Sequence, residues 1–329
     1  MSRAPRPSMP PPLPPRPKGM WRDTPPAIFP PIMGLMGLGL GWREASATLG
    51  APAGIGDLIL GASALLLVFC AAAWLAKPLR RPGVIPEELR VLPGRAGMAA
   101  MVLSVVLLAA ALVPLAPGLA LAVLVVAVAT HLALMGLVVR ALLTGPEEGR
   151  VVTPVFHLVF VGPILWPLSA IPLGFDAQPV LWGTIPVALV IWAVSAVQLI
   201  RRIPPAPLRP LLAIHLAPAS LFAIVASQLD LVVLANASAL LAATILIALL
   251  ASARWITAAG FSPLWGTFTF PLAAFATALL SVSGGAGLVG VLSGVALVAA
   301  TLAIPPIAFK VLQAWAKGGL AARTNAAVV

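Results

Sequence analysis

The stretch 261-FSPLWGTFTFPLAAFATALLSVS-283 guides the interpretation of the whole chain. It is long and apolar enough to cross a bilayer as a helix. Pro271, directly after Phe270, removes a backbone donor and clashes with the preceding turn. Proline also pushes the residue before it away from helical dihedrals. We therefore expect Phe270 to lie at a kink inside the membrane, where its ring either plugs a pore or packs between helices.

The composition indicates a polytopic membrane protein. Of 329 residues, 61% are hydrophobic and only 9% are charged, which no soluble domain matches. The single cysteine, Cys70, excludes an internal disulfide and any cysteine-based metal site. The net charge of +11 is explained by membrane topology, so no nucleic-acid partner is expected.

Three regions follow from the hydropathy pattern. Residues 1–24 are proline-rich and basic, which predicts a disordered cytoplasmic tail and not a signal peptide. Residues 25–315 form the transmembrane domain, and residues 316–329 a cytoplasmic C-terminal tail. The expected fold is all-α, with ten spans at 25–43, 56–76, 96–115, 118–140, 152–174, 179–200, 208–228, 231–252, 264–283 and 286–311. Polar loops are expected at 83–93 and 144–151.

The basic residues predict the orientation. With the N-terminus in the cytoplasm, 19 of the 20 Lys and Arg residues fall inside, and only Arg43 falls outside. The positive-inside rule therefore places both termini in the cytoplasm and requires an even number of spans. Six tryptophans lie near span ends, as in an aromatic belt; they are Trp42, Trp74, Trp182, Trp255, Trp265 and Trp315.

Prolines gather in the odd-numbered spans. Phe29-Pro30-Pro31 lies in the first, Pro163 in the fifth, Pro218 in the seventh and Pro271 in the ninth. Matching interruptions in repeated helices point to a permeation path. The pattern is weakened by Pro186 in the sixth span and by the third span, which has no mid-span proline. It still predicts helical hairpins of about 55 residues, with one kinked inner helix and one smooth outer helix each. Each kink should free the carbonyl four residues earlier, namely that of Thr267, Ile214 or Val159.

Chemistry-bearing residues are few. No charge is expected at the bilayer centre, which argues against a tightly coupled pump; the nearest carboxylates, Asp57 and Asp230, fit solvated helix ends. His131, on an expected outer helix, fits a packing role, whereas His157 and His215, on inner helices, either pack or face a water-filled path. The sequence has no nucleotide-binding, zinc-protease or serine-hydrolase motif, so no cofactor, metal or enzymatic activity is expected.

Four stretches carry a family resemblance: PPAIFPPIMGLMGLGLGW (25–42), FHLVFVGP (156–163), LAIHLAPASLFAIVAS (212–227) and LWGTFTFPLAAF (264–275). Their order and spacing resemble the tellurite-resistance/dicarboxylate transporter family, which includes the bacterial tellurite-resistance channel and the plant slow-type anion channel. The resemblance covers about residues 25–315. One departure is Pro163, where the plant channels have asparagine, which puts anion selectivity at that wall in question.

The resemblance implies five hairpins in a pseudo-five-fold arrangement around a central pore, assembled as a homotrimer. It also implies that a helix-9 phenylalanine occludes the pore. Trp265, Thr269 and Phe270 match that pattern, so Phe270 is the expected gate, with Phe268 the competitor on another helix face. Phe29, Pro30, His157, Pro163, His215, Pro218, Thr267 and Pro271 are the other expected pore-lining or kink residues.

These observations favour an anion channel or channel-like exporter of a bacterial-type inner membrane. Its partners would be the lipid bilayer and small inorganic or dicarboxylate anions, and an apolar constriction would gate it. A proton-coupled C4-dicarboxylate or sulfite carrier, with His157 or His215 as the proton relay, is the alternative. An intramembrane enzyme that uses the histidines is a third hypothesis, for which the sequence shows no catalytic constellation.

Overall fold

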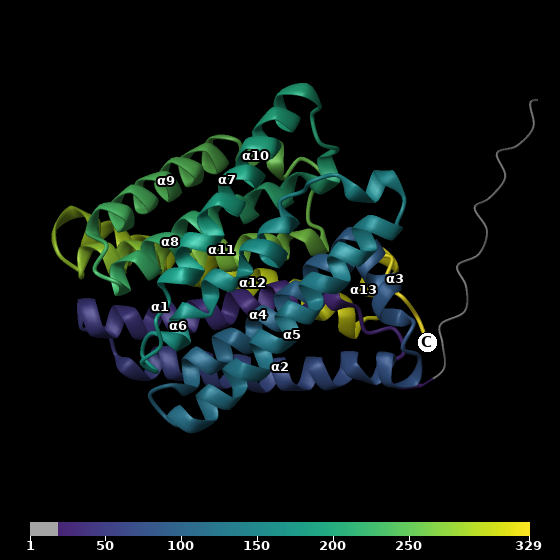
Figure 1. Ribbon diagram of the computed structural model, residues 1–329, viewed down its shortest axis with the longest axis horizontal. Helices are drawn as coiled ribbons and strands as arrows, with labels where there is room; N and C mark the ends of the chain where they lie inside the picture. Colours follow the sequence, from purple (N-terminus) through teal and green to yellow (C-terminus); the bar gives the residue numbers. More distant parts are fainter. Residues whose placement is uncertain (1–18) are drawn as a thin grey trace, which may run out of the picture.

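A computed structural model describes residues 19–329, and the part of the expected N-terminal tail at 1–18 lies outside the described residues. Within residues 19–329 the chain is helical and contains no strand (Figure 1). The α-helices are α1 Phe29–Leu49, α2 Ala53–Arg80, α3 Val84–Arg90, α4 Leu92–Leu112, α5 Pro117–Thr144, α6 Pro167–Ala170, α7 Gln178–Arg201, α8 Leu216–Gln228, α9 Val232–Ala251, α10 Ala253–Ile256, α11 Gly266–Ser283, α12 Gly287–Ala316 and α13 Leu320–Arg323. Shorter 3-10 or π turns are η1 Pro26–Ile28, η2 Glu147–Arg150, η3 His157–Val161, η4 Gly162–Leu165, η5 Ala206–His215 and η6 Pro263–Trp265.

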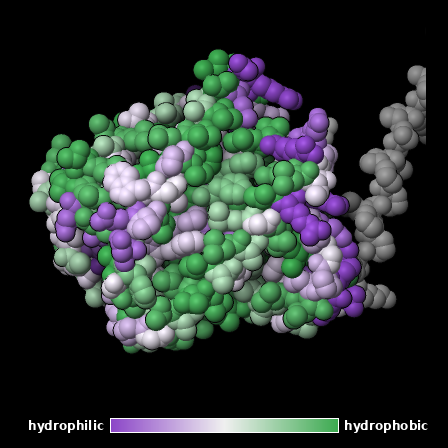
Figure 2. All heavy atoms as spheres, viewed as in Figure 1, coloured by the Kyte–Doolittle hydropathy of each residue, from purple (hydrophilic) through white to green (hydrophobic). Residues whose placement is uncertain are grey.

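Eight helical stretches in the described residues are long and apolar enough to cross a membrane. They correspond to eight of the ten expected spans, and the all-α membrane class is confirmed. Figure 2 shows the matching surface, in which a wide apolar band separates hydrophilic residues gathered toward the two ends of the bundle.

The other two expected spans are helical but are not both long and apolar enough to count among these eight. α1 is 21 residues long, yet it contains two prolines, four glycines and the charged pair Arg43-Glu44. The fifth expected span is broken into η3, η4 and α6 between His157 and Ala170. Pro163 and Pro167 lie in this stretch, and proline cannot supply the amide that a continuous helix requires.

The helices form two layers. The burial of each candidate span can be compared over an apolar stretch of 18 residues. In α4, in η5–α8 and in η6–α11, between 61% and 83% of that stretch is buried within the chain. In α2, α5, α7, α9 and α12 the share is only 22–33%, which leaves their apolar side chains for lipid or another subunit. We call α1, α4, η3–η4–α6, η5–α8 and α11 the inner segments. We call α2, α5, α7, α9 and α12 the outer helices. Each inner segment contacts the next along the chain, and α11 contacts α1, so the inner segments close a ring.

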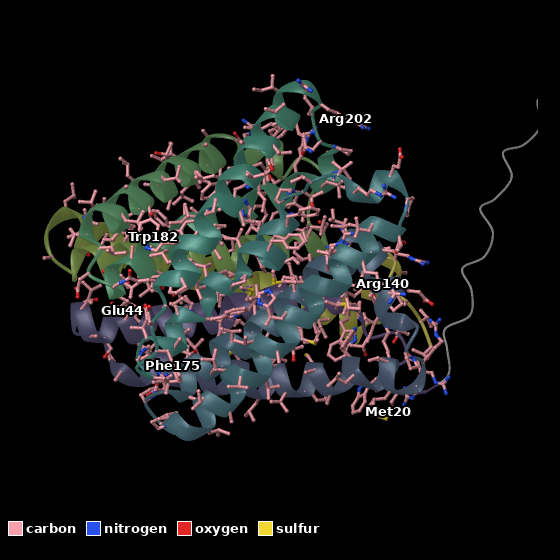
Figure 3. The ribbon with its side chains drawn as sticks, in the orientation of Figure 1. Met20, Glu44, Arg140, Phe175, Trp182 and Arg202 are labelled. Carbon is pink, nitrogen blue, oxygen red and sulfur yellow. The ribbon has the colours of Figure 1, made fainter. Side chains whose placement is uncertain are left out.

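Both ends of the described chain lie at one end of the bundle. Figure 3 shows Met20, Arg140 and Arg202 toward this end, and Glu44, Phe175 and Trp182 toward the other. We call the first the terminal end and the second the opposite end. The Val329 amide donates to the Arg22 carbonyl at 3.0 Å, which joins the N-terminal and C-terminal segments directly.

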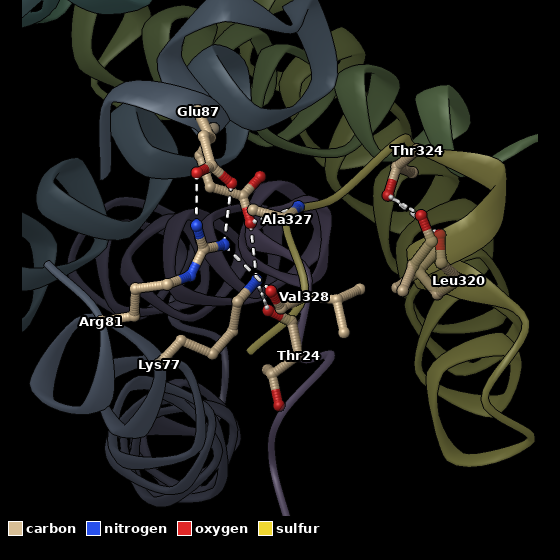
Figure 4. Close-up of polar contacts among 10 residues, drawn as sticks. Thr24, Lys77, Arg81, Glu87, Leu320, Thr324, Ala327 and Val328 are labelled. Atoms are coloured by element: carbon tan, nitrogen blue, oxygen red, sulfur yellow. Dashed lines mark hydrogen bonds and ion pairs between the residues drawn. The ribbon is translucent and has the colours of Figure 1, made fainter. Parts of the chain in front are cut away.

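A buried ion pair at the terminal end holds these segments in place (Figure 4). Lys77 Nζ on α2 lies 2.6 Å from Glu88 Oε1 on α3, and both side chains are fully buried. Lys77 also donates to the Thr24 carbonyl at 2.9 Å, and the Ala327 amide donates to Glu88 at 3.2 Å. Thr24 and Ala327, which the sequence placed in the two tails, are therefore bonded to side chains of α2 and α3.

Two local expectations differ from the structure. The expected polar loop at 83–93 contains the short helix α3, because its hydrophobic side chains Val84 and Leu89 are buried. The expected departure of Phe270 from helical geometry is absent, since α11 is helical from Gly266 through Pro271 to Ser283. Pro271 lies early in α11, and the irregular turn η6 precedes that helix instead.

Candidate functional site

Two cavities lie inside the ring of inner segments. The near cavity, closer to the terminal end, has a volume of about 40 Å³. Its walls are almost entirely apolar, and its lining residues include Pro30, His157, Pro218, Leu221, Thr267 and Phe270. A space of this size holds only a few waters or one small ion.

The far cavity, toward the opposite end, is larger and more polar. Its volume is about 350 Å³, and Arg43, Glu44, Gln228, Thr277 and Ser281 contribute to its walls. All the residues that line the two cavities belong to the inner segments or to the turns that directly follow them. No residue of the five outer helices lines either cavity in the described part of the chain.

Phe270 and Leu221 line both cavities, so their side chains separate the two spaces. Phe270 comes from α11 and Leu221 from α8, and each is more than nine-tenths buried. Gly37 on α1 also lies against the ring of Phe270. The partition is thus made of apolar groups from three inner segments.

Phe268 is in a different environment. It lines a groove together with Leu216, Leu246 and Ile307, and its ring lies edge-on to Trp265 with centroids 5.8 Å apart. It borders neither the near nor the far cavity.

A comparison with protein-family models identifies this architecture. Residues 23–309 match the model described as voltage-dependent anion channel, which covers most of the chain. The chain belongs to the voltage-dependent anion channel family. This confirms the resemblance expected from the sequence motifs, since tellurite-resistance channels share that model. Among curated proteins, none matches the chain.

Six of the nine expected site residues line the near cavity of this anion channel family member: Phe270, Pro30, His157, Pro218, Thr267 and Pro271. The other three, Phe29, Pro163 and His215, line neither cavity. Pro163 lies between Gly162 and Ile164, which line the near cavity. Phe29 is fully buried at the start of α1, and Pro30 follows it in the first turn, where a missing amide costs nothing. Neither residue kinks a helix interior.

His131 accounts for one of the freed carbonyls. Because Pro163 has no amide, the Val159 carbonyl lacks its helical partner, and His131 Nε2 lies 3.0 Å from that oxygen. Trp166 Nε1 donates to His131 Nδ1 at 3.2 Å. Both ring nitrogens are therefore engaged, with Nδ1 as acceptor and Nε2–H as donor, which fits the packing role expected for His131.

His157 and His215 lie together, which the sequence spacing did not indicate. His157 Nε2 is 3.0 Å from His215 Nδ1. The described residues contain no group of three or more His, Cys, Asp or Glu side chains that could hold a metal ion. The pair is therefore a hydrogen-bonded contact between two inner segments beside the near cavity.

Charged groups at the opposite end were only partly expected. Asp57 lies 2.6 Å from Arg43, which also donates to the Ala111 carbonyl at 2.7 Å. Asp230 occupies a left-handed turn with φ of 57° between α8 and α9. Glu44 was not an expected site residue, yet it lines the far cavity, and only its position beside Arg43 could have suggested this. Leu221 carries no distinguishing sequence signal.

Proposed function

We propose that the protein is an anion channel or channel-like exporter whose pore runs through the near and far cavities and is closed by Phe270. The observation that carries this proposal is the shared partition: Phe270 and Leu221 border a cavity on each side. An apolar constriction of this kind excludes water and ions until its side chains move. Membership of a voltage-dependent anion channel family supports small anions as the permeant species.

The inner and outer layers support a ten-span arrangement. In this proposal α1 and the broken η3–η4–α6 segment complete five hairpins with pseudo-five-fold symmetry. Backbone interruptions at membrane depth are tolerated where they line a cavity, and η3–η4 lies against the near cavity. The exposed apolar faces of the outer helices leave surface for lipid and for the homotrimer.

Orientation and location follow from the distribution of charge. We place the terminal end in the cytoplasm of a bacterial-type cell and the opposite end outside its inner membrane. Basic residues then surround the cytoplasmic mouth and attract anions to it. The far cavity carries Arg43, whose charge Asp57 balances, together with Glu44.

The experiment is single-channel recording of Phe270→Ala and Phe268→Ala in planar bilayers. Phe270→Ala should increase anion current strongly, because it removes the ring between the cavities, and Phe268→Ala should not. Increased current only in Phe268→Ala, or in neither variant, would contradict the proposed gate.

A proton-coupled dicarboxylate or sulfite carrier is the second candidate, and the buried His157–His215 contact is the observation in its favour. It predicts that uptake collapses when the pH gradient is dissipated, whereas a channel remains conductive without that gradient.

A further inference from the structure

One histidine of the pair lines the near cavity and has an unused ring nitrogen. His157 begins η3 and His215 ends η5, and their ring centroids are 5.1 Å apart. His157 lines the near cavity and is only 3% exposed. Its Nε2 faces His215, while its Nδ1 is buried and has no hydrogen-bond partner among the described residues.

Trp192 on α7 packs against the pair. Its ring centroid lies 5.5 Å from that of His157, and its Nε1 donates to the backbone carbonyl of His215 at 3.3 Å. Trp192 therefore contacts the His157 ring and the backbone of His215. His131, the third histidine, differs because both of its nitrogens already have partners.

Proton counting shows what the pair can do. The contact between His157 Nε2 and His215 Nδ1 needs one hydrogen, supplied by either ring. In the neutral pair, His157 Nδ1 carries a hydrogen only if His215 is the donor. When one more proton binds and the contact is kept, His157 Nδ1 carries a hydrogen in both possible arrangements. A second extra proton would make both facing nitrogens donors and break the contact.

The surroundings offer that proton no counter-charge. No Asp or Glu lies on the elements that pack against η3 or η5. Their other ionisable side chains are basic or neutral: Arg95 on α4, His131 and Arg140 on α5, Arg201 on α7, Arg209 on η5 itself and Arg254 on α10. A buried charge is tolerated only when it is paired. The partner of a protonated pair must therefore come from outside the chain, as an anion.

We propose that the His157–His215 pair takes up one proton from water and then binds one small monovalent inorganic anion in the near cavity. The inference rests on the proposed function in that the same cavity is the anion path. The anion accepts a hydrogen bond from His157 Nδ1–H and neutralises the bound proton. The volume of about 40 Å³ fits an ion of this size and not a dicarboxylate.

The first test measures binding and does not depend on conduction. The thermal unfolding midpoint of the full-length wild-type chain in detergent is recorded with chloride, against gluconate, at about pH 7.5 and about pH 5.5, which span the range of histidine titration. Chloride should raise the midpoint by about 2–4 °C at the lower pH only. His157→Gln and His215→Gln should lose this shift, while His131→Gln should keep it.

The second test uses the Phe270→Ala channel. Its chloride current should rise several-fold when the pH on the terminal side falls over that range, and the His157→Gln/His215→Gln double variant should abolish the rise. A Phe270→Ala channel that conducts but is insensitive to pH overturns the histidine site and leaves the pore proposal intact. If the Phe270→Ala channel carries no current, the pore proposal is overturned. The effect of chloride on the unfolding midpoint then still tests the histidine site separately. A midpoint shift that persists in His157→Gln contradicts the histidine site.

Discussion

The ring of Phe270 on α11 lies directly against the α-carbon of Gly37 on α1. A β-carbon built on residue 37 would lie 2.9 Å from Phe270 Cδ2, closer than real β-carbons approach, and 3.0 Å from Cε2. Gly37 is therefore required for the ring to sit between α1 and α8. Gly34, one turn earlier, meets the side chain of Thr269 even more closely.

This contact predicts strong coupling between residues 37 and 270. Gly37→Ala should destabilise the protein by about 1–3 kcal/mol, because the added methyl forces the ring to shift. In the Phe270→Ala background the same change should cost much less, since the ring is gone. Thermal stability of the four proteins measures the coupling. Gly136→Ala on α5 is the control, because a β-carbon at residue 136 would meet nothing within 4 Å; equal costs of Gly37→Ala in both backgrounds would refute the contact.

Leu221 should form the second half of the barrier. It borders both cavities beside Phe270, so Leu221→Ala should also increase anion current. The increase should be smaller than for Phe270→Ala, because less apolar bulk is removed, and the double variant should conduct most. Leu211, buried in a separate cluster near Val155, is the control position. Single-channel recording of these variants would reject the shared barrier if Leu221→Ala and Leu211→Ala behaved alike.

The sequence predicted the helical spans better than the contacts between them. Prolines interrupt one inner segment, η3–η4–α6, but they also lie inside three outer helices, as Pro78 in α2, Pro186 in α7 and Pro305-Pro306 in α12. Proline content alone therefore does not separate the two layers. Glycines carry no clearer signal: Gly37 and Gly136 look alike in the sequence, although a β-carbon at residue 37 would meet an aromatic ring and one at residue 136 would meet open space.

The histidine contact was also beyond the sequence. His157 and His215 are 58 residues apart, and their meeting depends on how two irregular turns, η3 and η5, align across the ring. The departure from helical geometry expected at Phe270 was wrong, since Phe270 and Pro271 both lie within α11, and the irregular turn η6 comes before that helix.

The proposed membrane orientation can be tested without recording ionic current. In a Cys70→Ala background, Phe175→Cys should react with a membrane-impermeant maleimide added outside intact cells. Arg202→Cys should react only after the membrane is opened, because it lies at the terminal end with the C-terminus. Both side chains are exposed in the structure. The reverse labelling pattern would invert the proposed orientation.

His131 should act as a structural partner of the broken segment. His131→Leu leaves the buried Val159 carbonyl without its donor, so stability should fall by about 1–3 kcal/mol. His131→Gln retains a donor and should lose less. Chloride current through the Phe270→Ala channel should be the same with either change, after correction for the amount of folded protein. A change in pH response or ion selectivity would instead place His131 on the anion path.

Two adjacent glutamates should respond to pH in opposite directions. Hydrogen bonds from Arg81 lower the pKa of Glu87, whereas burial raises the pKa of Glu88, whose Oε2 has no partner among the described residues. For Glu87 the folded pKa lies below the ordinary value of 4.5, so its contribution to stability is present above pH 4.5 and is lost as the pH falls. For Glu88 the folded pKa lies above 4.5, so its contribution is complete below pH 4.5 and is lost as the pH rises through the folded pKa.

Unfolding free energies measured against pH should separate the two residues. Glu88→Gln should flatten the part of the curve above pH 4.5, where wild-type stability falls because of Glu88. Glu87→Gln should affect only the part below pH 4.5, and weakly, because its pair with Arg81 is 42% exposed on each side and therefore screened by solvent. The buried pair joins α2, α3, Thr24 and Ala327, so its pH response should also appear in the release of the C-terminal segment, measured by protease sensitivity after Arg323. Identical slopes for wild type and Glu88→Gln above pH 4.5 would show that burial does not control this carboxyl.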